Sequence, residues 1–114
     1  MNGMMMKVRL TLGNGKEIGI GVSDGHYCNP RKSPIDMGIG EEYDKIEIGF
    51  PTMKDGNTFR LKGIGDDGTG MIYPYVPIQI LISIIRTNGG LVLISGKENR
   101  MMGIPKKISD LLMI

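Results

Sequence analysis

The sequence predicts a single, mainly β domain of small antiparallel sheets or a sandwich, with one short helix at its C-terminal end. Three observations predict this class. The 114 residues fit one domain with a modest core. Apolar and polar residues alternate in several short runs, which is the period of a half-buried strand. Glycine occurs 18 times, about twice its average frequency, which favours many turns over long helices.

The first two strands are predicted on either side of a tight turn. The runs "KVRLTL" (7–12) and "KEIGIGV" (16–22) both alternate, and "GNG" (13–15) stands between them. Two alternating runs around Asn-Gly are typical of a β-hairpin. The apolar positions that share a face are Val8, Leu10, Leu12, Ile18, Ile20 and Val22.

A long loop and two further strands are expected next. Residues 23–43 contain prolines and glycines without any period, and loops of this length are uncommon unless they are functional or mobile. "DKIEIGF" (44–50) alternates again, and we expect Pro51 to end this strand because proline cannot donate to a ladder. After the turn "PTMKDGN" (51–57), "TFRLK" (58–62) predicts a fourth strand.

The C-terminal half begins with "MIYPYVPIQILISII" (71–85), a long segment whose β-branched residues favour strand over helix. Pro74 and Pro77 confine its first half to a sheet edge or a bulge. Turn signals around Leu91–Ser95 predict another hairpin. "PKKISDLLMI" (105–114) predicts the short terminal helix, because proline suits a first helical turn.

Charge and cysteine content exclude several classes of function. The formal charge of +2 is too small to indicate a nucleic-acid or membrane partner, and no cofactor is expected. Cys28 is the only cysteine, which excludes an intramolecular disulfide and a zinc site of paired cysteines, and favours a cytoplasmic location. The apolar run 75–85 is too short to cross a bilayer. Residues 1–6, rich in methionine, lack a signal-peptide core and predict a flexible tail.

The segment "KGIGDDGTG" (62–70) carries the spacing G-x-G-x-x-G of a dinucleotide-binding loop. A phosphate site needs a helix to begin at the last glycine, and "TGMIYP" cannot supply one. Asp66 and Asp67 would also place negative charge where the phosphate should lie. The carboxylate spacing of a calcium-binding EF-hand is absent as well. We therefore interpret this segment as a glycine turn between strands.

The residues before this turn resemble the C-terminal domains of the Hsp40 (J-protein) co-chaperones over roughly residues 7–82. The resemblance rests on "IEIGF", on "YVPIQI", and on Pro51, Lys54, Gly56, Phe59, Leu61, Lys62, Gly63 and Gly65. Thr52 departs from the family pattern, which usually has glycine there. His26 is followed by Tyr27, so the chain lacks the His-Pro-Asp triplet of a J-domain, and a single cysteine excludes the family's zinc insert. The resemblance implies a divergent copy of the domain over 7–85, with residues 86–114 as an extra hairpin and helix packed on it.

The same resemblance implies a non-enzymatic protein that binds extended apolar segments of unfolded or partner proteins. In that family a peptide adds a strand beside the second strand and fills an apolar groove, by β-augmentation. The matching positions are Lys16, Ile18 and Ile20, lined by Leu10 and Leu12. The alternative for these isoleucines is that they belong to the core.

Two other functions stay open. The protein could be a small structural or assembly module that forms homo-oligomers through its edge strands. It could also be a hydrolase-like enzyme that uses His26 and Cys28, although the sequence supplies no orienting third group. The basic residues Lys97, Arg100, Lys106 and Lys107 lack the interleaved aromatics of a nucleic-acid site. The acidic residues Glu41, Glu42 and Asp44 predict a solvated loop.

Overall fold

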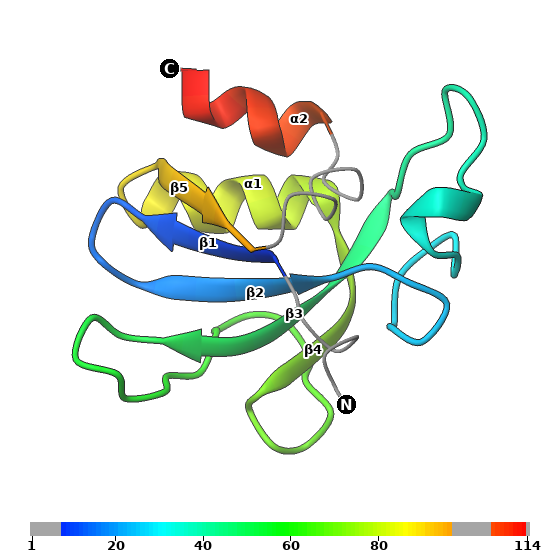
Figure 1. Ribbon diagram of the computed structural model, residues 1–114. Helices are drawn as coiled ribbons and strands as arrows, with labels where there is room; N and C mark the ends of the chain where they lie inside the picture. Colours follow the sequence, from blue (N-terminus) through cyan, green and yellow to red (C-terminus); the bar gives the residue numbers. More distant parts are fainter. Residues whose placement is uncertain (1–7, 97–105, 114) are drawn as a thin grey trace.

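The computed structural model describes residues 8–96 and 106–113 of the chain (Figure 1). The described strands are β1 (Val8–Leu12), β2 (Glu17–Gly21), β3 (Lys45–Thr52), β4 (Ile72–Pro77) and β5 (Leu91–Ser95). The described helices are α1 (Ile78–Thr87) and α2 (Lys106–Ser109), with short 3-10 turns at Pro34–Asp36 and Asp110–Met113. The tail predicted for residues 1–6 lies outside the described residues.

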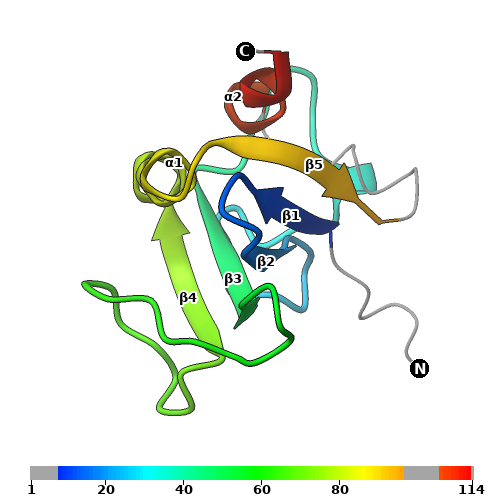
Figure 2. The same cartoon turned by 90° about the vertical axis from the view of Figure 1, so that its left-hand side faces the viewer.

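All five strands belong to one antiparallel sheet in the order β4-β3-β2-β1-β5. The first four strands follow one another as neighbours, whereas β5 returns to pair with β1 on its far side. This arrangement confirms the predicted mainly β, antiparallel class and the short C-terminal helix. Figure 2 shows how the sheet curls from β4 round to β5, with α1 near the gap between these two edge strands.

One face of the sheet, which we call the core face, is buried against α1 and α2. It carries the alternating apolar residues that the sequence predicts, and α1 adds side chains at the spacing i, i+3, i+4 and i+7 of one helical face. The core includes Val8, Leu10, Leu12, Ile18, Ile20, Ile46, Ile48, Tyr73, Val76, Ile78, Leu81, Ile82, Ile85 and Ile108. The opposite face, which carries Arg9, Gly19 and Gly49 at paired positions, is called the outer face below.

The β1–β2 hairpin is confirmed, and its turn interlocks with the turn between α1 and β5. The Gly13 N–H donates to the Gly90 carbonyl oxygen (2.9 Å), and the Asn14 N–H donates to the Asn88 carbonyl oxygen (3.0 Å). The two backbones approach so closely that a Cβ atom on Gly13 would lie 2.1 Å from the Gly89 carbonyl oxygen. Only glycine therefore fits at position 13.

Three predicted elements differ from the structure: the end of β3, the strand expected at residues 58–62, and the segment that forms α1. β3 does not end before Pro51 but continues to Thr52, because a register shift opposite β2 leaves the proline outside the regular ladder. The fourth strand predicted for residues 58–62 is wrong. That segment forms only an isolated bridge between Thr58 and Thr52, and the resemblance to Hsp40 domains had placed Phe59 and Leu61 on this strand.

The third difference is α1. The sequence predicted extended chain over 71–85, but the strand ends at Pro77 and a helix of ten residues follows. The β-branched residues of this segment favour strand, yet their apolar positions also fit one face of a helix, and burial of that face outweighs the weak local propensity. The first half of the prediction is confirmed, since β4 is an edge strand with a register shift opposite β3.

Candidate functional site

The structure contradicts the groove predicted beside the second strand. β2 lies in the middle of the sheet, with β3 on one side and β1 on the other, so it has no free edge for an added strand. Its Ile18 and Ile20, and the predicted lining residues Leu10 and Leu12, are buried in the core. Alternation along a strand shows which side chains share a face, but it does not show whether the strand is central.

The fifth predicted groove residue, Lys16, lies in the turn before β2. Its ammonium nitrogen is 4.6 Å from the centre of the Phe59 ring, a cation–π contact that holds the 58–62 segment against the hairpin. Lys16 therefore does not lie with the four buried residues that were predicted to form the groove. It contributes to packing between the β1–β2 turn and the 58–62 segment.

The backbone of β2 is also covered on the outer face, although Gly19 and Gly21 have no side chains. Arg9 crosses Gly19, and its guanidinium donates to the Thr52 hydroxyl (2.8 Å) on β3. The His26 ring packs on Gly21, where an added Cβ atom would lie 2.5 Å from the ring. The two glycines leave room for side chains of this chain rather than for a partner.

The two true edges of the sheet differ in chemistry. Along β4, Pro74 and Pro77 have no N–H group to donate. The Tyr75 N–H already donates to the Tyr27 carbonyl oxygen (2.9 Å) of the long loop. Prolines and a covering loop are devices that keep an edge from pairing with another chain. The β4 edge is therefore closed.

The β5 edge has no strand partner within the described part of the chain, although the 3-10 turn Asp110–Met113 packs close to it. β5 pairs with β1 on one side, and no described strand pairs with its other side. The strand "LVLIS" contains neither a charged residue nor a proline, and its one irregularity is a bulge at Val92 in the pairing with β1. Val92 and Leu93 are 60% and 52% exposed, which is high for large apolar side chains in a sheet. An edge with these properties is a template for pairing with another extended chain.

The side chains of β5 point to both faces of the sheet. Leu93 pairs with Thr11 and so lies on the outer face, whereas Ile94 pairs with Leu10 and lies on the core face. Ile94 and Leu111 are half-buried against the core. An added strand would thus find apolar neighbours at alternate positions on each face, and we take Leu91–Ser95, the β5 edge, as the candidate binding site.

The structure does not bring His26 and Cys28 together as a nucleophilic pair. The Cys28 thiol is 1% exposed and donates to the carbonyl oxygens of Ser23 (3.3 Å) and Pro30 (3.4 Å). Burial raises the pKa of this thiol, whereas a reactive cysteine needs a lowered one. His26 Nδ1 instead lies 2.6 Å from the Ser23 hydroxyl, within a tight turn.

This turn anchors the first part of the long loop on the outer face. The buried carboxylate of Glu47 on β3 accepts a hydrogen bond from the Tyr27 N–H (3.0 Å). The Tyr27 ring then reaches the surface, where its centre is 5.9 Å from that of Tyr75. The Arg31 guanidinium lies 5.3 Å from the centre of the Tyr27 ring, on the same patch. Sequence reasoning missed this surface patch, and the only signal for it was the unusual length of the loop.

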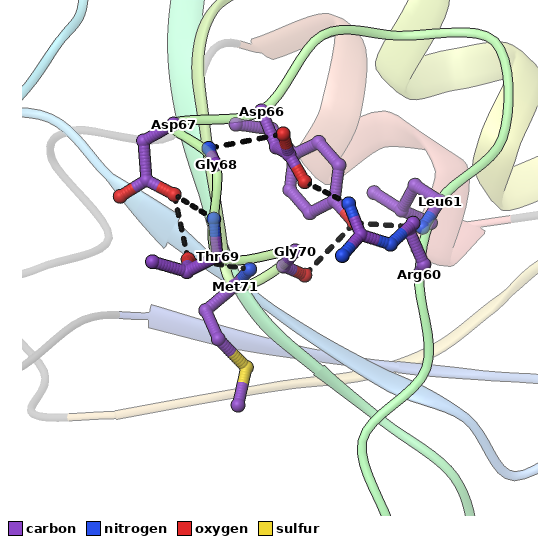
Figure 3. Close-up of polar contacts among 9 residues, drawn as sticks. Arg60, Leu61, Asp66, Asp67, Gly68, Thr69, Gly70 and Met71 are labelled. Atoms are coloured by element: carbon purple, nitrogen blue, oxygen red, sulfur yellow. Dashed lines mark hydrogen bonds and ion pairs between the residues drawn. The ribbon is translucent and has the colours of Figure 1, made fainter.

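The glycine segment 62–70 forms turns as predicted, although the strand expected before it is absent, and its carboxylates accept hydrogen bonds within the loop (Figure 3). Asp66 forms an ion pair with Arg60 and accepts the Gly68 N–H (3.1 Å). Asp67 accepts the Thr69 N–H (3.0 Å) and hydroxyl (2.6 Å), which lower the pKa of its carboxyl group. These contacts fix the shape of the loop and leave no cradle for a phosphate.

The buried phenol of Tyr73 fastens the same segment to the sheet. Its hydroxyl oxygen accepts the Leu61 N–H (2.8 Å), and its O–H donates to the Gly70 carbonyl oxygen (2.9 Å). This replaces the strand ladder that the sequence predicted for residues 58–62.

The acidic run lies partly on an open pocket of about 270 Å³ at the start of α1, which is small for a ligand site. The lining residues are Glu42, Tyr43, Asp44, Pro77, Ile78, Gln79 and Lys107. Glu41 is instead paired with Lys32 (3.1 Å) and accepts the Gly38 N–H (2.8 Å). Of the predicted basic residues, Lys97 and Arg100 lie outside the described residues.

No group of three or more potential metal ligands occurs among residues 8–96 and 106–113. Neither α1 nor any other helix in the described part of the chain is long and apolar enough to cross a membrane. Comparisons with protein-family models, curated proteins and solved structures give no match. The fold therefore defines the protein as a small antiparallel β domain in which β5 has no second strand partner among the described residues.

Proposed function

We propose that this protein is a non-enzymatic binding module that accepts an extended polypeptide segment by strand addition at the β5 edge. The observation that supports this proposal is the contrast between the two edges of the sheet. β4 contains Pro74 and Pro77, which have no N–H group, and its Tyr75 N–H already donates to the Tyr27 carbonyl oxygen. β5 instead consists of uncharged residues and exposes the apolar side chains of Val92 and Leu93. The peptide binding that the Hsp40 resemblance implies thus moves from the second strand to the fifth.

The bound partner would be an unfolded chain or a segment of a partner protein in the cytoplasm. Backbone groups of β5 would supply the hydrogen bonds, and Leu93 on the outer face and Ile94 on the core face would meet alternate partner side chains. Partner segments with small or β-branched apolar residues and no proline fit this chemistry, because proline cannot donate to the new ladder.

The expected affinity is low. Each new hydrogen bond contributes about 0.5–1.5 kcal/mol net, and a well-covered Val92 or Leu93 contributes at most about 1.5–3 kcal/mol. Ordering the peptide backbone costs about 1–2 kcal/mol per residue, so most of the gain is cancelled. A dissociation constant in the micromolar range or weaker follows.

Fluorescence anisotropy tests this function with a short labelled peptide of alternating valine and threonine. We expect saturable binding that weakens at least about tenfold in Leu93→Lys, because a charged edge residue opposes pairing. Ile35→Lys is the matched control, since Ile35 is 83% exposed on the long loop, away from β5. A peptide with proline at alternate positions should not bind. Absent binding, or equal weakening in both variants, contradicts the proposal.

A further inference from the structure

We propose that residues 106–113, which we call the C-terminal cap, form an autoinhibitory contact on the β5 edge that an extended partner must displace. The inference rests on the proposed function and deepens it, because it assigns a regulator to the same edge. The cap consists of α2 (Lys106–Ser109) and the 3-10 turn Asp110–Met113. A segment of this chain thus competes with the partner for β5.

The cap lies where an added strand would have to lie. The turn Asp110–Met113 contacts β5, and Figures 1 and 2 place the cap above β5, on the side away from β1. An added strand would lie about 4.7–4.9 Å from β5 on that same side. The cap and a partner strand therefore cannot occupy the full length of the edge together.

Two apolar side chains hold the cap in place. Ile108 is 1% exposed and belongs to the core. Leu111 is half-buried against the core, as Ile94 of β5 is. A helix as short as α2 has no stability of its own in water, because helix nucleation is unfavourable. The cap therefore keeps its position through this packing, and a competing apolar segment can replace it.

The cap leaves part of β5 accessible. Val92 and Leu93 are 60% and 52% exposed with the cap in place, whereas Ile94 is half-buried. Val92 is also the extra residue of the bulge opposite β1, and an extra residue of this kind is not paired in the ladder. A partner can first contact these two exposed residues and then displace the cap from the rest of the strand.

A closed cap raises the apparent dissociation constant of the partner. When only a fraction of the protein molecules is competent to bind, the apparent constant equals the intrinsic constant divided by that fraction. A change that weakens the cap should therefore tighten binding, whereas the loss of a binding contact would weaken it. The half-buried Leu111 side chain predicts that Leu111→Ala tightens binding about fivefold, which corresponds to about 1 kcal/mol.

Fluorescence anisotropy with the labelled valine–threonine peptide measures this change in the full chain. We expect about fivefold tighter binding in Leu111→Ala than in the unaltered protein. Val76→Ala is the matched control, because Val76 is a buried residue on β4, at the opposite edge of the sheet from β5. It removes apolar packing from the core and should not tighten binding. Circular dichroism confirms that both variants are folded.

Thiol labelling measures displacement of the cap directly. In Ile108→Cys the introduced thiol is the probe and the native Cys28 is the internal control, since both positions are 1% exposed. A saturating concentration of the peptide should speed labelling at position 108 at least about tenfold, because the displaced cap exposes it, and should leave Cys28 slow to react.

The outcomes separate the cap from the binding function. If the peptide binds the unaltered protein but Leu111→Ala binds no more tightly, or labelling at position 108 is no faster with peptide, the cap is not an inhibitor and the proposed function still stands. Absence of binding in the unaltered protein and in all the variants overturns both. Equal tightening in Leu111→Ala and Val76→Ala also overturns the inference, because general loosening of the core would then explain the gain.

Discussion

The contact between the β1–β2 turn and the α1–β5 turn makes Gly13→Ala a sharp test of the fold. The added Cβ atom would lie 2.1 Å from the carbonyl oxygen of Gly89, 2.6 Å from its carbonyl carbon and 2.9 Å from its Cα atom, where ordinary contacts begin at 3.4 Å. All three atoms belong to the backbone, so no side-chain rotation relieves the overlap. The two turns must move apart.

The cost can be worked out from what this movement breaks. Overpacking of this kind costs about 1–3 kcal/mol. Separation of the turns also weakens the bonds from Gly13 to Gly90 (2.9 Å) and from Asn14 to Asn88 (3.0 Å), each worth about 0.5–1.5 kcal/mol net. We expect Gly13→Ala to lower the free energy of unfolding by about 2–4 kcal/mol.

Urea unfolding followed by circular dichroism measures this loss, with an unchanged m value as the sign that both states keep their compactness. Gly65→Ala is the matched control, because nothing lies within 4 Å of its added Cβ atom and its φ is not positive. It should change stability little or raise it by about 0.4–1 kcal/mol. A loss below about 1 kcal/mol in Gly13→Ala, or a similar loss in both variants, would refute the reasoning.

Three further predictions concern buried polar groups. Tyr73→Phe should cost about 1–3 kcal/mol in urea unfolding, because it leaves the buried Leu61 N–H without its acceptor; an unchanged midpoint would contradict the bond. The Cys28 thiol should react slowly with a thiol reagent in the folded protein and rapidly in denaturant, because it is buried and its pKa is raised; fast native labelling would argue against its burial. Burial, and secondarily the nearby Cys28, raise the pKa of the Tyr43 phenol. The folded state then keeps a proton that the unfolded chain loses near pH 10, so stability should fall as the pH rises above about 10, and less steeply in Tyr43→Phe.

Local features of the fold could be predicted from the sequence, and long-range features could not. The β1–β2 hairpin follows from alternation around Asn-Gly, and the edge position of β4 follows from the backbone chemistry of Pro74 and Pro77. The pairing of β5 with β1 joins residues that no local pattern connects. Because the sequence does not reveal that pairing, it does not identify β2 as a central strand, and it leaves Ile18 and Ile20 open between a groove and the core, where the structure places them.

The prediction for the α1 segment was wrong for a different reason. Its isoleucines fit both an extended strand and one face of a helix, and only the space beneath the curled sheet decides between them. The candidate site was equally hidden, since the unpaired β5 edge and the closed β4 edge are defined by their neighbours in space and not by their own residues alone.

The pairing of β1 with β5 has a consequence for synthesis on the ribosome. Leu12 pairs with Leu91, which is 79 residues later in the chain. At about 5–20 residues per second, β1 waits roughly 4–16 s for this neighbour. During that time the nascent β1–β4 meander presents the unpaired edge of β1 to its surroundings, and premature pairing with another nascent chain competes with completion of the sheet. Slower translation should therefore raise the fraction that misassembles, in contrast to proteins whose neighbouring strands emerge together.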